Sequence, residues 1–124
     1  MGSHIPALLL EKTGDLNMKY KAKQLWIVID TICGGYYIYK DEKVIEKAKQ
    51  AAKQVQEYCD FFLHGNHFGM NEEEYRDLCS YVIHVLKDFV EALEQEDTVL
   101  MLDTLDYGLR ELVNLYHEKD EAAV

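Results

Sequence analysis

Residues 102–116 have the sequence LDTLDYGLRELVNLY, and this stretch decides the fold. Its large apolar residues recur in steps of three and four, the spacing that gathers side chains on one face of an α-helix. They are Leu102, Leu105, Leu109, Leu112 and Tyr116. Charged residues such as Asp103 and Glu111 fall off this stripe. We therefore predict an amphipathic helix that buries its stripe against neighbouring helices.

Two stretches further upstream carry the same pattern. One stretch follows an Asn71 and Glu74 pair that is typical of a capped helix start, and it places on one face Tyr75, Leu78, Val82, Val85, Phe89 and Leu93. Another helix is expected to begin behind a capping Asp41 and to end at the glycine-containing loop 64–70. Its stripe comprises Val44, Ala48, Ala51, Val55, Tyr58 and Phe62.

Residues 24–40 are open to two interpretations. Leu25 to Ile29 are strand-forming residues, and Gly34-Gly35 could turn a β-hairpin, which would make the fold α+β with a hairpin at 24–40. A hairpin beside three helices would have no sheet to complete. Helical spacing is also present, in Ala22, Leu25, Ile29, Ile32, Tyr36 and Tyr39. We therefore favour an all-α fold, an antiparallel up-down four-helix bundle.

The chain of 124 residues is expected to form a single helical domain over residues 18–124. Met1 to His4 resemble residues left by an expression vector, and Met18 is a plausible native start. Residues 1–17 are therefore predicted to be a leader that is partly vector-derived and poorly ordered.

The net charge of the chain limits the kinds of partner that it is expected to bind. Thirteen Lys and Arg stand against 23 Asp and Glu, a formal net charge of −10, so nucleic acids and anionic membranes should repel it. Cys33, Cys59 and Cys79 form no CxxC pair, which suits reduced thiols in the cytoplasm. No apolar run is long enough to cross a bilayer. We expect no nucleic-acid partner and no membrane association.

Two histidines in one loop superficially suggest a metal site. His64 and His67 lie near Cys59 and Asp60, but a structural metal site usually supplies a second ligand pair at fixed spacing. We therefore expect solvent-facing loop residues, with no metal and no cofactor.

One pair of residues offers catalytic chemistry. Arg110 and His117 have a spacing similar to the RxnH spacing of HEPN domains, small all-helical units that cleave RNA. The similarity covers one helix, and Glu111 stands where Asn or Asp is usual. It implies a ribonuclease or toxin–antitoxin component in which the Arg steadies a phosphate and the His transfers a proton.

The favoured hypothesis is a non-enzymatic protein-interaction module. Nine tyrosines are unusual for a chain of this length and are explained by core packing or by a binding surface. The first helix carries apolar residues beside its stripe, which we predict to form an interaction surface: Trp26, Ile27, Val28, Tyr37 and Ile38. Such a module would be a small acidic adaptor, inhibitor or chaperone-like bundle, self-associating as a homodimer. An acidic mimic of nucleic acid that binds a basic protein groove is a further alternative.

Asp30 lies inside the apolar run of the first helix, where an unpaired charge would be costly to bury. We expect its side chain to face water or to bond a Tyr or Lys of a neighbouring helix.

Overall fold

The computed structural model describes the backbone of residues 7–122 and the side chains of residues 17–116. Within this part every element is helical. The helices are α1 (Ala7–Tyr39), α2 (Val44–Leu63), α3 (Glu72–Gln95) and a last helix in three parts, α4 (Thr98–Asp103), the π-helical segment η1 (Thr104–Leu109) and α5 (Arg110–Ala122). The all-α prediction is confirmed. The hairpin alternative at 24–40 is wrong, because residues 24–39 belong to the continuous helix α1.

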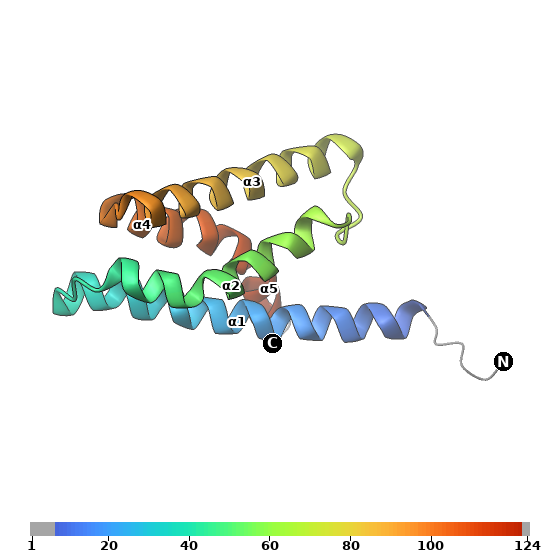
Figure 1. Cartoon of the computed structure of the whole chain (residues 1–124). Coiled ribbons are helices and arrows are strands. Elements are labelled where there is room, and N and C mark those ends of the chain that lie inside the picture. The colour runs from blue at the N-terminus through green and yellow to red at the C-terminus, as the bar shows by residue number, and fades with distance from the viewer. Residues whose placement is uncertain (1–6, 123–124) are drawn as a thin grey trace.

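The helices form a bundle in which successive helices run in opposite directions (Figure 1). α1 packs against α2 and α5, α2 against α3, and α3 against α4 and η1. The last helix therefore lies along α3 at its start and reaches α1 at its end. α1 begins at Ala7, inside the predicted leader, but residues 1–6 and the side chains of residues 7–16 lie outside the described part, so the disorder of the leader stays a prediction.

The stripes seen in the sequence supply most of the core. All six stripe residues of α2 are buried, and so are all five of the last helix. In α3, Val82, Val85 and Phe89 are buried, while the stripe residues nearer its ends are half-buried. Removing these apolar side chains from water is the main stabilising contribution, about 1.5 to 3 kcal/mol for each fully buried large residue. The helical periodicity therefore predicted which face of each helix is buried.

Side-chain caps mark two of the helix starts. The Asn71 side chain accepts a hydrogen bond from the Glu74 backbone N–H at 2.8 Å, as predicted. Asp97 does the same for Leu100 at 3.0 Å, a cap that our sequence analysis did not include. The predicted cap at Asp41 is wrong. α2 begins two residues later than such a cap requires, so Asp41 instead accepts from the Lys43 N–H and forms an ion pair with Lys47.

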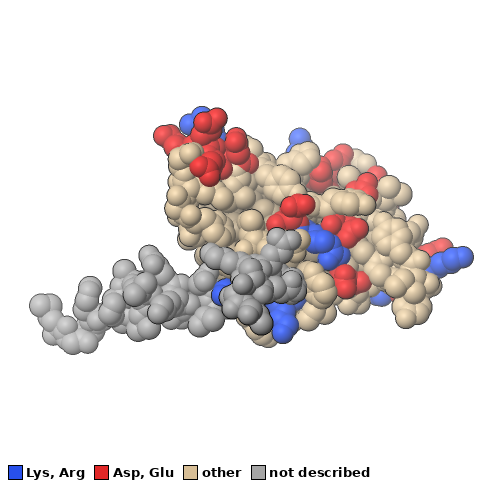
Figure 2. Space-filling view, turned by 180° about the vertical axis from the view of Figure 1, so that it is seen from behind, with Lys and Arg blue, Asp and Glu red and all other residues tan. Residues whose placement is uncertain are grey.

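Acidic side chains gather where α3 begins, at the upper left of Figure 2. The first turn of α3 contains Glu72, Glu73 and Glu74. Negative charge at this position is stabilising because the free N–H groups give a helix start a partial positive charge. None of the helices in the described part combines the length and the apolarity needed to span a membrane.

Candidate functional site

The predicted interaction surface on α1 divides into two groups. Ile27, Tyr37 and Ile38 are exposed, with relative accessibilities of 46%, 59% and 72%. Trp26 and Val28 instead are half-buried and pack against the core. Each of the two directly follows or precedes a core residue, Leu25 or Ile29, and lies at the edge of the core, so Ile27, Tyr37 and Ile38 are the exposed members of the predicted surface.

The outer face of α1 carries a second regular stripe, which we call the outer row. Its members recur in steps of four and three: Tyr20, Gln24, Ile27, Thr31, Gly34 and Ile38. Alternating steps of this kind form the contact seam of a two-helix coiled coil. Two shallow furrows along α1 and α2 border the row, one lined by Ile27 and Thr31 and the other by Thr31, Gly34 and Ile38. A Cβ placed on Gly34 would meet no atom within 4 Å, so the row has an open gap at that point.

Arg110 is held by two carboxylates. Its Nε donates to Asp106 Oδ1 at 3.0 Å, and its Nη2 donates to Asp30 Oδ1 at 3.3 Å. Asp30 is thus paired with an arginine, where we expected Tyr, Lys or water. These contacts balance the guanidinium charge locally and leave it poorly disposed to receive an RNA phosphate. The His117 side chain lies outside the described residues, so the geometry of the proposed Arg110 and His117 pair is not described.

The buried thiol of Cys33 lies beside this cluster. Burial chiefly, and the neighbouring Asp106 carboxylate in addition, raise its pKa to about 11. Burial likewise raises the pKa of Cys59 to about 12. Reactive cysteines are those whose pKa is lowered, and both of these thiols stay protonated at neutral pH. Their environment is that of core residues.

His64 and His67 help to shape their loop. The His64 Nδ1 lies 2.6 Å from the Asp60 carbonyl, and the His67 Nε2 lies 3.0 Å from the Phe61 carbonyl. The His67 ring also stacks on Phe61 with 3.9 Å between centroids. In the described part of the chain, no three His, Cys, Asp or Glu side chains are grouped to hold a metal ion.

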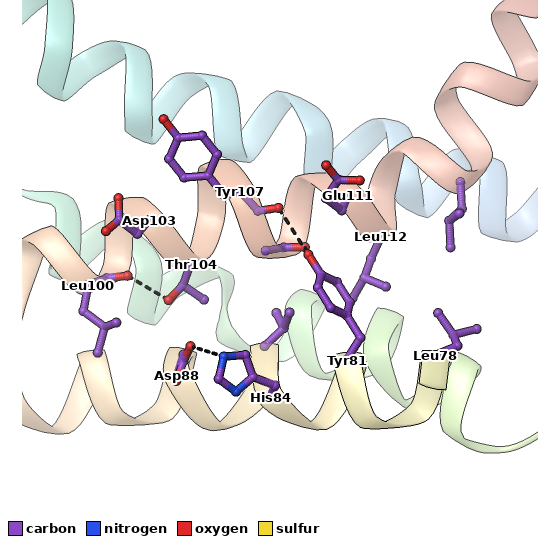
Figure 3. A pocket seen from close by; sticks show the side chains of 13 residues that line it. Leu78, Tyr81, His84, Asp88, Leu100, Asp103, Thr104, Tyr107, Glu111 and Leu112 are labelled. Atoms are coloured by element: carbon purple, nitrogen blue, oxygen red, sulfur yellow. Dashed lines mark hydrogen bonds and ion pairs between the residues drawn. The ribbon is translucent and has the colours of Figure 1, made fainter. Parts of the chain in front are cut away.

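A groove of about 660 Å³ lies between α3 and the last helix (Figure 3). Five aliphatic side chains line it, of which Val85 and Leu112 are buried and the rest half-buried: Leu78, Val85, Leu100, Leu112 and Leu115. The ring of Tyr81 stands beside them, and Tyr107 also belongs to the lining. Apolar grooves between helices are common binding sites, and our sequence analysis had not singled out this one.

The π-helical segment shapes the groove. The Tyr81 hydroxyl of α3 donates to the carbonyl oxygens of Gly108 at 3.1 Å and Tyr107 at 3.4 Å, which ties α3 to the wide turn. A Cβ on Gly108 would lie 3.2 Å from a methyl group of Val85, so glycine allows α3 to approach closely there. Thr104 donates to the Leu100 carbonyl at 2.7 Å. Short π-helical turns inside α-helices occur frequently at functional sites.

The rim of the groove is acidic. Asp88, Asp103 and Glu111 belong to its lining, which contains neither Lys nor Arg. His84 is the one histidine of this lining, and its Nε2 lies 3.2 Å from Asp88 Oδ2 (Figure 3). The groove therefore combines an apolar floor with negative charge at its edge.

The sequence holds a partial signal for the groove. Gly108 and Thr104 are small residues close to an otherwise leucine-rich stripe, and Tyr81, His84 and Asp88 share one face of α3 at helical spacing. Neither pattern shows that the two faces meet.

Comparisons with models of known protein families, with curated proteins and with solved structures find no match to this chain.

Proposed function

We propose that this chain is a non-enzymatic protein-interaction module, of the adaptor, inhibitor or chaperone-like kind, that self-associates through the outer row of α1. The observation that carries the proposal is the set of three large exposed apolar side chains within this row. Ile38 and Tyr20 are 72% and 64% exposed, and Ile27 is 46% exposed, at the spacing of a helix-pairing seam. Exposed apolar side chains in such a pattern mark interaction sites more often than isolated ones.

A second copy of the chain suits the row because the spacing of its members is the same in both directions along the helix. Its steps of four, three, four, three and four are symmetric, as a two-fold, self-complementary interface requires. In an antiparallel pair of α1 helices, Tyr20 lies opposite Ile38, Gln24 opposite Gly34 and Ile27 opposite Thr31. Each larger side chain at the centre of the row thus meets a smaller one. The gap at Gly34 receives the longer Gln24.

The charges near the centre of an antiparallel pair of α1 helices are also compatible with dimerisation. Asp30 flanks the middle of the row, where two copies of its carboxylate would approach each other. Its ion pair with Arg110, at 3.3 Å, offsets that repulsion within each copy. The same ion pair removes the free guanidinium that an RNA-cleaving site would need, which favours the interaction module over the ribonuclease alternative.

Light scattering on the purified chain tests the proposal. We expect the mass of two chains for the wild type and the mass of one chain for Ile38→Asp, with circular dichroism showing that both remain helical. Ile83→Asp is the matched control, because Ile83 is a 55% exposed isoleucine on α3 and its variant should stay dimeric. Trp26→Asp is unsuitable, since Trp26 packs against the core.

Salt dependence supplies a second criterion. Two copies with a formal charge of −10 each repel one another, and salt screens that repulsion. Dimerisation through an apolar row should therefore strengthen as salt rises. A folded wild type that has the mass of one chain at every concentration and salt level refutes self-association.

A further inference from the structure

The groove between α3 and the last helix lies apart from the outer row, and its chemistry points to another occupant. Its described lining supplies apolar side chains from both walls, Leu78 and Val85 from α3 and Leu100, Leu112 and Leu115 from the last helix. From Leu78 to Asp88 the α3 wall is about 15 Å long at 1.5 Å per residue. That length accommodates about three turns of a bound helix.

The carboxylates of the rim select the charge of that occupant. Asp103 and Glu111 are exposed and come from the last helix, whereas Asp88 comes from α3 and pairs with His84 (Figure 3). With neither Lys nor Arg in the lining, a bound anion would be repelled from three directions. Lys or Arg side chains of a bound helix could instead reach the carboxylates while their apolar neighbours cover the floor.

The two tyrosines strengthen this match. Tyr81 is fixed in place by its hydrogen bonds to the carbonyl groups of Tyr107 and Gly108, so it loses little freedom when a ligand binds. Tyr107 is also part of the lining and is 68% exposed, and Tyr81 keeps 37% of its surface exposed. Lysine and arginine side chains pack favourably on tyrosine rings through cation–π contacts.

A second copy of the outer row fits this groove poorly. Three of its six members, Gln24, Thr31 and Gly34, bring little apolar area to a floor built of leucines. The flanking Asp30 would meet the acidic rim.

We propose that this groove binds an amphipathic helix of a partner protein that carries Lys or Arg beside its apolar residues. The partner thus occupies a surface distinct from the one used for self-association. Helix-in-groove recognition of this kind relies on apolar anchors at helical spacing. Here the acidic rim adds a preference for basic flanks.

The test uses a defined probe, a labelled peptide of about twelve residues with Leu at i, i+3 and i+7 positions and Lys between them. One comparison peptide has the same composition with the leucines spread around the helix. Another has Glu in place of Lys. Fluorescence anisotropy should show binding of the first peptide alone, and its affinity should fall as salt rises.

Matched variants locate the binding. Glu111→Lys should weaken binding of the Lys peptide about tenfold at low salt. Glu94→Lys makes the same charge change at an exposed α3 position outside the groove lining and should keep the affinity within about twofold. Circular dichroism checks that both variants fold.

Three outcomes overturn the proposal: no binding of the Lys peptide at low salt, equal binding of the rearranged peptide, or equal losses in the two variants. The last two results would indicate attraction to the overall negative charge alone. The monomeric Ile38→Asp variant should bind the peptide like the wild type. A failure of the groove proposal can therefore be distinguished from a failure of the self-association proposal.

Discussion

The hydroxyl group of Tyr58 ties α2 to α5, and its removal offers a sharp test of the packing. Tyr58 is fully buried, and its hydroxyl donates to the Leu112 carbonyl at 2.8 Å. Tyr58→Phe deletes one oxygen without emptying the ring site. Because Leu112 lies within α5, its carbonyl keeps a helical partner, so the loss is one net hydrogen bond, about 0.5 to 1.5 kcal/mol.

Tyr81→Phe is the matched comparison, since it deletes the same atom at a different depth. Tyr81 is 37% exposed, and water can replace its hydroxyl at the Gly108 and Tyr107 carbonyls. We expect its free energy of unfolding to change by less than about 0.5 kcal/mol.

Urea unfolding followed by far-ultraviolet circular dichroism measures both variants. A loss of about 1 kcal/mol should also lower the melting temperature of Tyr58→Phe by about 3 to 6 °C. Equal losses in the two variants would refute the reasoning, because burial would then not decide the value of the bond. A larger loss at Tyr81 than at Tyr58 would refute it more strongly.

Three further predictions concern the core, a helix cap and the thiols. Leu109→Ala should lower the free energy of unfolding by about 2 to 5 kcal/mol, whereas Val99→Ala, at a 66% exposed position, should change it by less than about 0.5 kcal/mol in the same urea assay. Asn71→Ala should cost about 1 kcal/mol, because it removes the cap on the Glu74 N–H, and Asn71→Asp should retain most of that stability. Because the pKa values of Cys33 and Cys59 are raised from 9.0 to about 11 and about 12, these thiols ionise first in the unfolded chain, so stability should fall as pH rises above about 9. Replacing both by alanine should make that fall shallower in unfolding curves measured at a series of pH values, and an unchanged fall would contradict this assignment.

Local periodicity was sufficient to predict the helices and most of the core. The stripe from Leu102 to Tyr116 and the cap at Asn71 follow from interactions between residues close in the chain. The same holds for α1. Strand-forming residues such as Val28 adopt a helical conformation there because the residues at helical spacing around them can be buried together.

The candidate sites depend on contacts between distant residues and were harder to predict. Nothing near Trp26 in the sequence shows that it packs inward, because that depends on where the neighbouring helices lie. The groove requires Tyr81 to meet Gly108, 27 positions away. A stripe identifies a buried face but does not identify the helix that covers it. The π-helical segment is equally hidden, since its residues continue the regular steps of three and four.

That wide turn makes one helix serve two neighbours. An extra residue in a single turn rotates everything beyond it by about 100° relative to a continuous α-helix. Before η1 the helix packs on α2 and α3, and after it the helix packs on α1. Winding the same residues as a continuous α-helix would turn the leucines of α5 away from α1, whereas deleting one residue between Thr104 and Leu109 would leave a regular α-helix that still directs them at α1. The wide turn therefore takes up one extra residue of chain while the side chains before and after it stay directed at their separate neighbours.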